Sequence, residues 1–146
     1  MDSTPQLPRL VPHLSGDKIE VRDGWISFVA VGEQTGGAYA VIETANEPST
    51  GVRLHVHERE DETWFVIEGE YVFQVGDQTF HARAGDYVFG PRGVPHRYAN
   101  WTAWLSRALI MVTPAGFEGF WRESARLGDD AAAHEALGQR YGVRSV

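Results

Sequence analysis

The stretch "LHVHEREDETWFVIEGE", from Leu54 to Glu70, places two histidines one residue apart, directly before five consecutive charged residues. Side chains alternate across a β-strand, so His55 and His57 point to the same face, with Cα atoms roughly 6.5–7 Å apart. Two imidazoles at that spacing can share one metal ion. Two surface histidines beside a solvated charged loop would show the same pattern, so this stretch alone leaves both interpretations open.

A second stretch, "AGDYVFGPRGVPHRYAN" from residue 84 to residue 100, supplies a third histidine. Gly85-Asp86 is typical of a turn before a strand, and Pro91-Arg92-Gly93 is typical of a second turn. His96 then lies on the following strand. An antiparallel barrel can bring that strand opposite His55 and His57, which favours a metal site over two unrelated surface histidines.

The segments around these two stretches predict an all-β protein. Short runs rich in Val, Ile, Phe, Tyr and Trp, such as "WISFVAV", "AYAVIET" and "WLSRALIMV", alternate with turn residues between Trp25 and Val112. Many short strands separated by Gly and Pro turns indicate a sandwich or a barrel. We therefore expect one domain, with its barrel over residues 25–113.

The two ends of the chain differ from this central part. Prolines at positions 5, 8 and 12 predict an arm without regular structure over residues 1–24. Over residues 114–146 we expect a helical tail. The first helix of the tail is capped by Thr113, and its aromatic residues Phe117, Phe120 and Trp121 are expected to pack on the barrel or on a partner subunit. The second helix is expected over "AAAHEALGQR". It begins after Asp129 or Asp130 and ends near Gly142.

Composition narrows the class of function. The 146-residue chain has a net charge of −7 and no Lys/Arg run, so we expect no binding to nucleic acid or to an anionic membrane. It has no cysteine, so a metal site must use His, Asp or Glu. The N-terminus lacks a signal-peptide pattern and no apolar run reaches membrane-spanning length, which predicts a cytoplasmic protein.

The two histidine stretches resemble the two motifs of the cupin superfamily. In the first motif a glycine, H-x-H, a glutamate and a second glycine follow one another at set intervals. It is matched here by His55, His57, Glu62 and Gly69, while the opening glycine stands at Gly51 where the pattern expects position 49. The second motif matches in full, at Gly85, Pro91, Gly93, His96 and Asn100. The stretches around the two motifs and the C-terminal tail resemble those of single-domain quercetin-dioxygenase-like cupins of bacteria.

The resemblance implies a small jelly-roll barrel with short C-terminal helices and one divalent metal ion per chain. The implied ligands are His55, His57, Glu62 and His96, and the ion could be Ni, Fe, Co, Mn, Cu or Zn. Asp61 fits a shorter variant of the first motif and is the second candidate for the carboxylate ligand. Glu60 is a candidate outer-shell partner. Glu58 and Arg59 are expected to form an exposed pair, and His13, His81 and His134 to be structural or exposed.

By the same resemblance the protein is a dioxygenase for a small aromatic substrate, flavonol-like or polyketide-like, with Glu62 as general base. The alternatives are a non-oxidative isomerase or cyclase and a non-catalytic ligand-binding protein. We expect an aromatic cavity around the metal ion. We also expect a homodimer, because small barrels leave sheet edges that a partner subunit can cover. The aromatic residues of the predicted strands are Phe28, Tyr39, Trp64, Phe73, Tyr87, Phe89, Tyr98 and Trp104.

Overall fold

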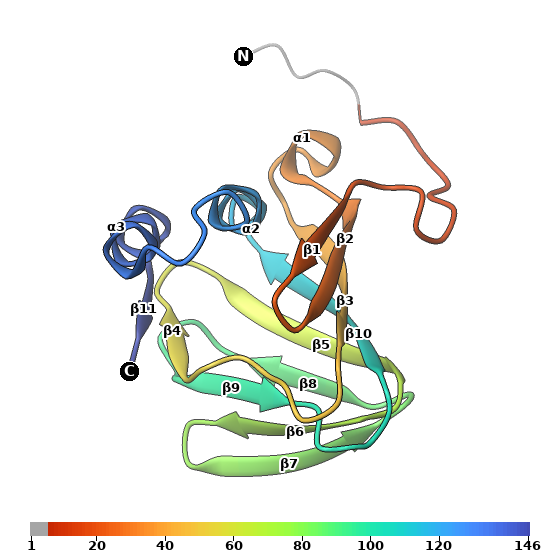
Figure 1. Ribbon diagram of the computed structural model, residues 1–146. Helices are drawn as coiled ribbons and strands as arrows, with labels where there is room; N and C mark the ends of the chain where they lie inside the picture. Colours follow the sequence, from red (N-terminus) through yellow and green to blue (C-terminus); the bar gives the residue numbers. More distant parts are fainter. Residues whose placement is uncertain (1–5) are drawn as a thin grey trace.

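The computed structural model describes residues 6–146, and its strands form two antiparallel β-sheets (Figure 1). The larger sheet contains, in spatial order, β1 (Lys18–Val21), β2 (Gly24–Ala30), β3 (Ala40–Asn46), β10 (Ser106–Thr113), β5 (Asp61–Glu68) and β8 (Tyr87–Gly90). The smaller sheet contains β11 (Val143–Ser145), β4 (His55–His57), β9 (His96–Ala99), β6 (Glu70–Val75) and β7 (Gln78–Arg83). The predicted all-β fold is confirmed.

The hydrophobic core lies between the two sheets. Strand β10 alternates strictly between buried and partly buried residues, and β5 buries Trp64 and Val66 while Phe65 faces outward. Inward-facing residues of the smaller sheet, such as Tyr71 and Phe73, belong to the same cluster of buried side chains. The strand alternation seen in the sequence therefore marks the two inner faces of a double-layered β structure.

Three helices accompany the sheets: α1 (Gly32–Thr35), α2 (Glu118–Ser124) and α3 (Ala131–Tyr141). The prediction for α3 is confirmed at both ends. The Asp130 side chain accepts a hydrogen bond from the Ala133 amide at 3.0 Å, and Gly142 ends the helix with a positive φ of 68°. The prediction for α2 was wrong at its start, because Thr113 is still part of β10 and pairs with Asp61 of β5.

Two strands were not predicted, one near each end of the chain. The expected arm over residues 1–24 includes β1, which pairs with β2 through a tight turn in which Val21 faces Gly24. The first five residues of the arm lie outside the described part of the chain. In the tail, β11 pairs with β4 (Figure 1). None of the helices in residues 6–146 combines the length and the apolar character that crossing a membrane requires.

Candidate metal centre

The four predicted ligands come together between the sheets. His55 and His57 lie on β4, and His96 lies on the neighbouring strand β9, directly opposite His55 in the register. Glu62 reaches the same point from β5 of the other sheet. One ligand atom from each residue lies within 4.8 Å of the others, and all but His55 are buried. Two sequence stretches some 40 positions apart thus converge on one point.

The histidine rings are held so that Nε2 faces this centre. Nδ1 of His55 donates to the Arg53 carbonyl at 2.6 Å, and Nδ1 of His96 donates to the Val94 carbonyl at 3.1 Å. A carbonyl oxygen only accepts, so the proton on Nδ1 is fixed in both rings. Nε2 of His96 and Nε2 of His57 lie 2.8 and 3.1 Å from Oε2 of Glu62. The Nε2 atoms are therefore the ones able to bind an ion.

Burial and charge oppose each other at this centre. Burial raises the pKa of Glu62, but hydrogen bonds from His57 and His96 outweigh it and hold that pKa well below its usual range. Burial lowers the pKa of His57, but the neighbouring carboxylates of Glu60 and Glu62 outweigh it and raise that pKa to about 9. Burial dominates at His55 and lowers its pKa to about 4. Glu62 is therefore an ionised carboxylate, as a metal ligand must be.

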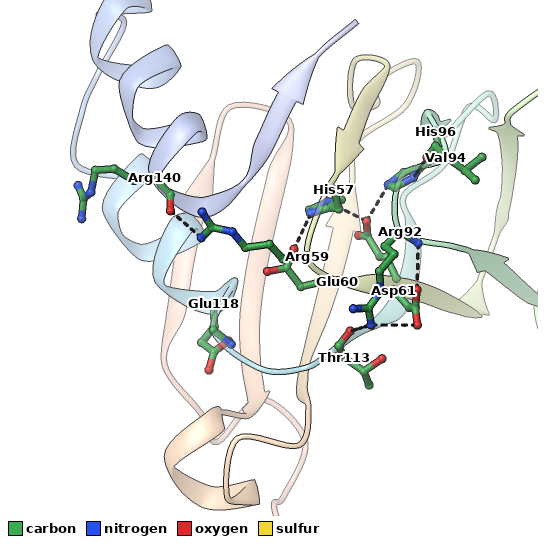
Figure 2. Close-up of polar contacts among 12 residues, drawn as sticks. His57, Arg59, Glu60, Asp61, Arg92, Val94, His96, Thr113, Glu118 and Arg140 are labelled. Atoms are coloured by element: carbon green, nitrogen blue, oxygen red, sulfur yellow. Dashed lines mark hydrogen bonds and ion pairs between the residues drawn. The ribbon is translucent and has the colours of Figure 1, made fainter.

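The neighbouring acidic residues have other partners. Asp61, the second candidate ligand, accepts hydrogen bonds from the backbone amide and the guanidinium of Arg92 at 2.9–3.3 Å, outside the cluster (Figure 2). Glu58 does not pair with Arg59 as predicted. It forms an exposed ion pair with Arg144 instead, because the C-terminal strand β11 lies beside β4.

Glu60 is buried, and its Oε2 faces Nδ1 of His57 at 3.5 Å. It is the one acidic neighbour that turns toward a residue of the cluster without being part of it (Figure 2).

Aromatic rings enclose the cluster. The Trp64 ring lies 5.1 Å from the ring of His96, and Phe117 lies 4.4 Å from that of His57, both edge-on. Gly90 makes room for Trp64, since a Cβ at that position would approach the indole to 2.9 Å. Phe117 comes from the tail, so the predicted aromatic stripe does pack on the β-sheets. The contact of Phe117 with His57 was not predicted, because the spacing of aromatic residues along a helix does not show which side chains of another segment they contact.

The predicted aromatic lining is only partly correct. Phe28, Trp64, Phe73 and Tyr98 are buried, whereas Tyr39, Tyr87, Phe89 and Trp104 are exposed. Hollows of about 420 and 170 Å³ lie on the outer surfaces, and none of the four clustered residues lines either of them. Neither of these two hollows is the candidate site, and the partly exposed His55 marks the side of the site open to solvent.

The residues present fit a divalent metal ion. Three imidazole nitrogens and one carboxylate form a mixed N/O donor set that accepts several first-row metals. Buried polar atoms without a hydrogen-bond partner in residues 6–146 are Nδ1 of His57, Oε2 of Glu60 and Nε1 of Trp64, all on residues of the cluster or touching it. An ion at the centre would offset the cost of burying so many polar groups together.

A family model described as "Cupin domain" matches residues 44–105, the part of the chain that contains all four clustered residues. Residues 44–105 form a cupin domain. The fold and both motifs inferred from the sequence therefore agree with the family. Asn100, the last residue of the second motif, has a structural role in this cupin. Its buried amide donates to the carbonyls of Asn46 and Trp104 at 2.9 and 2.7 Å.

Two curated proteins are similar in sequence to this chain. Quercetin 2,3-dioxygenase of Bacillus subtilis (strain 168) is 25% identical over 128 residues, which cover 88% of this chain and 37% of that protein. The HTH-type transcriptional regulator PuuR of Escherichia coli (strain K12) is 30% identical over 78 residues, which cover 53% of this chain and 42% of that protein. The chain thus spans 37–42% of the length of these relatives.

Among solved structures, KdgF from Halomonas sp. superposes with a TM-score of 0.68 at 15% identity, covering 77% of this chain and 99% of that one. At this identity the likeness concerns the fold alone. It agrees with the two-sheet jelly-roll architecture.

Proposed function

We propose that this cupin is a metal-dependent dioxygenase that acts on a small aromatic compound, flavonol-like or polyketide-like. The observation that carries the proposal is the convergence of three histidines and one carboxylate at a buried point of a cupin domain. The similarity to a quercetin dioxygenase over 88% of the chain supports the reaction type. A divalent ion held by His55, His57, Glu62 and His96 would supply Lewis acidity and an open coordination position for substrate.

Glu62 is the candidate general base. Both histidine contacts use Oε2 of its carboxylate, which leaves Oε1 to take a proton from a substrate hydroxyl. The buried position excludes bulk water, so a proton moved to Glu62 stays within the site. His57 and His96 hold the carboxylate in place for this step.

The surroundings favour a planar apolar substrate. The aromatic rings of Trp64 and Phe117 lie beside His96 and His57, and the charged side chains of Arg92 and Asp61 are engaged with each other outside the cluster. Aromatic surroundings of this kind would select a substrate by stacking and shape rather than by charge. The partly exposed His55 gives the direction from which a substrate would approach.

The test uses Glu62→Gln, which keeps an oxygen donor but removes the charge and the basicity. Protein loaded with each candidate metal in turn is screened for oxygen consumption with quercetin and smaller phenols. We expect the metal-saturated variant to remain about 10²–10⁴ times slower than the wild type, the usual contribution of a positioned base. A metal-saturated variant with near wild-type turnover would leave Glu62 as a ligand and refute its role as base.

Two other outcomes would replace the dioxygenase proposal. Turnover of an aromatic substrate without oxygen consumption would identify a non-oxidative isomerase or cyclase. Tight ligand binding without turnover would identify a ligand-binding cupin, an alternative supported by the similarity to a transcriptional regulator over 53% of this chain.

A further inference from the structure

Two of the three clustered histidines are oriented by the main chain. Nδ1 of His55 donates to the carbonyl of Arg53, and Nδ1 of His96 donates to the carbonyl of Val94. In both cases the acceptor belongs to the residue two positions earlier in the chain, just before the strand begins. Each ring is thereby fixed in the tautomer and in the direction that leave Nε2 facing the centre.

His57 lacks such a main-chain partner. The atom that faces its Nδ1 is Oε2 of Glu60 at 3.5 Å, an ion-pair contact too long for a good hydrogen bond, and neither atom has another partner among the described residues (Figure 2). Both side chains are almost completely buried, with 2% and 6% of their surfaces exposed. A donor and an acceptor kept from water without partners each cost free energy, and these two face each other.

We propose that Glu60 is a positioning residue that fixes His57 as a metal ligand. A hydrogen bond from Nδ1 of His57 to Oε2 of Glu60 supplies the constraint that the carbonyls of Arg53 and Val94 supply for the other two rings. Because this acceptor is a carboxylate, it also makes Nε2 of His57 more basic and therefore a stronger ligand for a metal ion. The inference rests on the metal binding proposed above.

The backbone around Glu60 is held rigidly enough for this role. The Glu58 amide donates to the Gly142 carbonyl at 2.8 Å. Nη1 of Arg59 donates to the Arg140 carbonyl at 2.8 Å (Figure 2). The end of α3 and the start of β11 thereby fix the loop between β4 and β5 on which Glu60 sits. Precise positioning of an outer partner needs such support, because a misplaced carboxylate gains nothing.

The test measures Co²⁺ affinity by competition with a coloured chelator. Glu60→Leu fills the same buried space without an acceptor, and we expect it to weaken Co²⁺ binding about 10–100-fold, the usual effect of losing an outer-shell partner. Glu60→Gln keeps an acceptor oxygen and should recover part of that loss. Glu58→Leu, two residues away and exposed, is the matched control and should bind Co²⁺ like the wild type.

Two further measurements separate positioning from folding. The visible spectrum of bound Co²⁺ reports ligand geometry, and we expect Glu60→Leu to change it while Glu60→Gln restores it. The free energy of unfolding of the metal-free variants shows whether stability follows the same order. Glu60→Leu with the affinity and the spectrum of wild type, or Glu60→Gln as weak as Glu60→Leu, would overturn this inference alone. A wild type that binds no Co²⁺ would overturn it together with the proposed metal site.

Discussion

The three histidines of the cluster have different environments although they point at one centre. His57 and His96 are buried and contact Glu62, whereas His55 is partly exposed and its neighbour across the strand pair is His96. Burial lowers the pKa of His55 to about 4, so that ring is neutral and ready to bind a cation at neutral pH. At the residue scale, the chemistry of each histidine is therefore set by its contacts rather than by its type.

The most direct test at this scale is the loss of one clustered histidine. His96→Ala removes the residue that joins β9 to Glu62, so metal affinity should fall by more than the roughly 10–100-fold that an outer partner contributes. His81→Ala is the matched control, because His81 is exposed and lies against Trp101. Elemental analysis at matched free metal measures occupancy, and equal occupancy in the two variants would contradict the assignment.

At the scale of elements, the strand that carries two of the clustered histidines depends on its neighbours. β4 has three residues, and its register with β9 consists of the single pair His55–His96. On its other edge β11 pairs along the whole of β4, from Val143–His57 to Ser145–His55. The Gly93 amide adds a bond to the His57 carbonyl at 2.7 Å. The C-terminal strand is thus the main support of β4.

Truncation after Gly142 tests this dependence. The loss of β11 removes the hydrogen bonds along one edge of β4, and at about 1 kcal/mol for each backbone bond we expect the free energy of unfolding to fall by about 2 kcal/mol. Metal affinity should fall as well, because His55 and His57 lose their support. Denaturant unfolding and Co²⁺ titration measure the two effects. Arg144→Ala keeps the strand and is the control; a truncated chain that matches it in both measurements would contradict this role of β11.

At the scale of the whole molecule, the outer face of the larger sheet carries exposed aromatic residues. Phe65 and Tyr87 lie opposite each other on β5 and β8 and are 46% and 62% exposed, and Phe89 on the same edge strand is 48% exposed. On the N-terminal arm, Leu7 and Leu10 are also exposed. Contiguous apolar surface on a sheet edge is typical of an interface, so we propose a homodimer that covers this face.

Light scattering at micromolar concentration tests the dimer. We expect twice the 16.3 kDa mass of one chain, because association buries the aromatic residues of β5 and β8. Tyr87→Glu places a charge on this face and should shift the mass toward that of one chain. Trp104→Glu changes an equally exposed aromatic residue in the loop between β9 and β10 and should not. A wild type that remains a monomer would refute the proposal.

Much of the fold was predictable from local pattern. Residue alternation and turn residues mark most strands, because burial of one face imposes a period of two on each strand of a two-layer protein. The ends of α3 could also be predicted from nearby residues, since Asp130 caps the first turn of the helix and Gly142 ends its last turn. H-x-H places the side chains of His55 and His57 on one face by strand alternation alone. Glu62 and His96 were implied by the resemblance to the two cupin motifs, and the structure brings all four together.

Only the tertiary structure decided which neighbours these residues have. Asp61 and Glu62 are adjacent in sequence, but the strand alternation turns Glu62 inward while Arg92, from a distant loop, pairs with Asp61 outside. The strand β11 and the packing of Phe117 on His57 were likewise not predictable, since a three-residue strand has no periodicity of its own and forms only where β4 offers an edge. The sequence by itself determined which side chains can bind an ion; the packing of distant segments decided which of them meet, because contacts between segments depend on three-dimensional neighbours that no local pattern specifies.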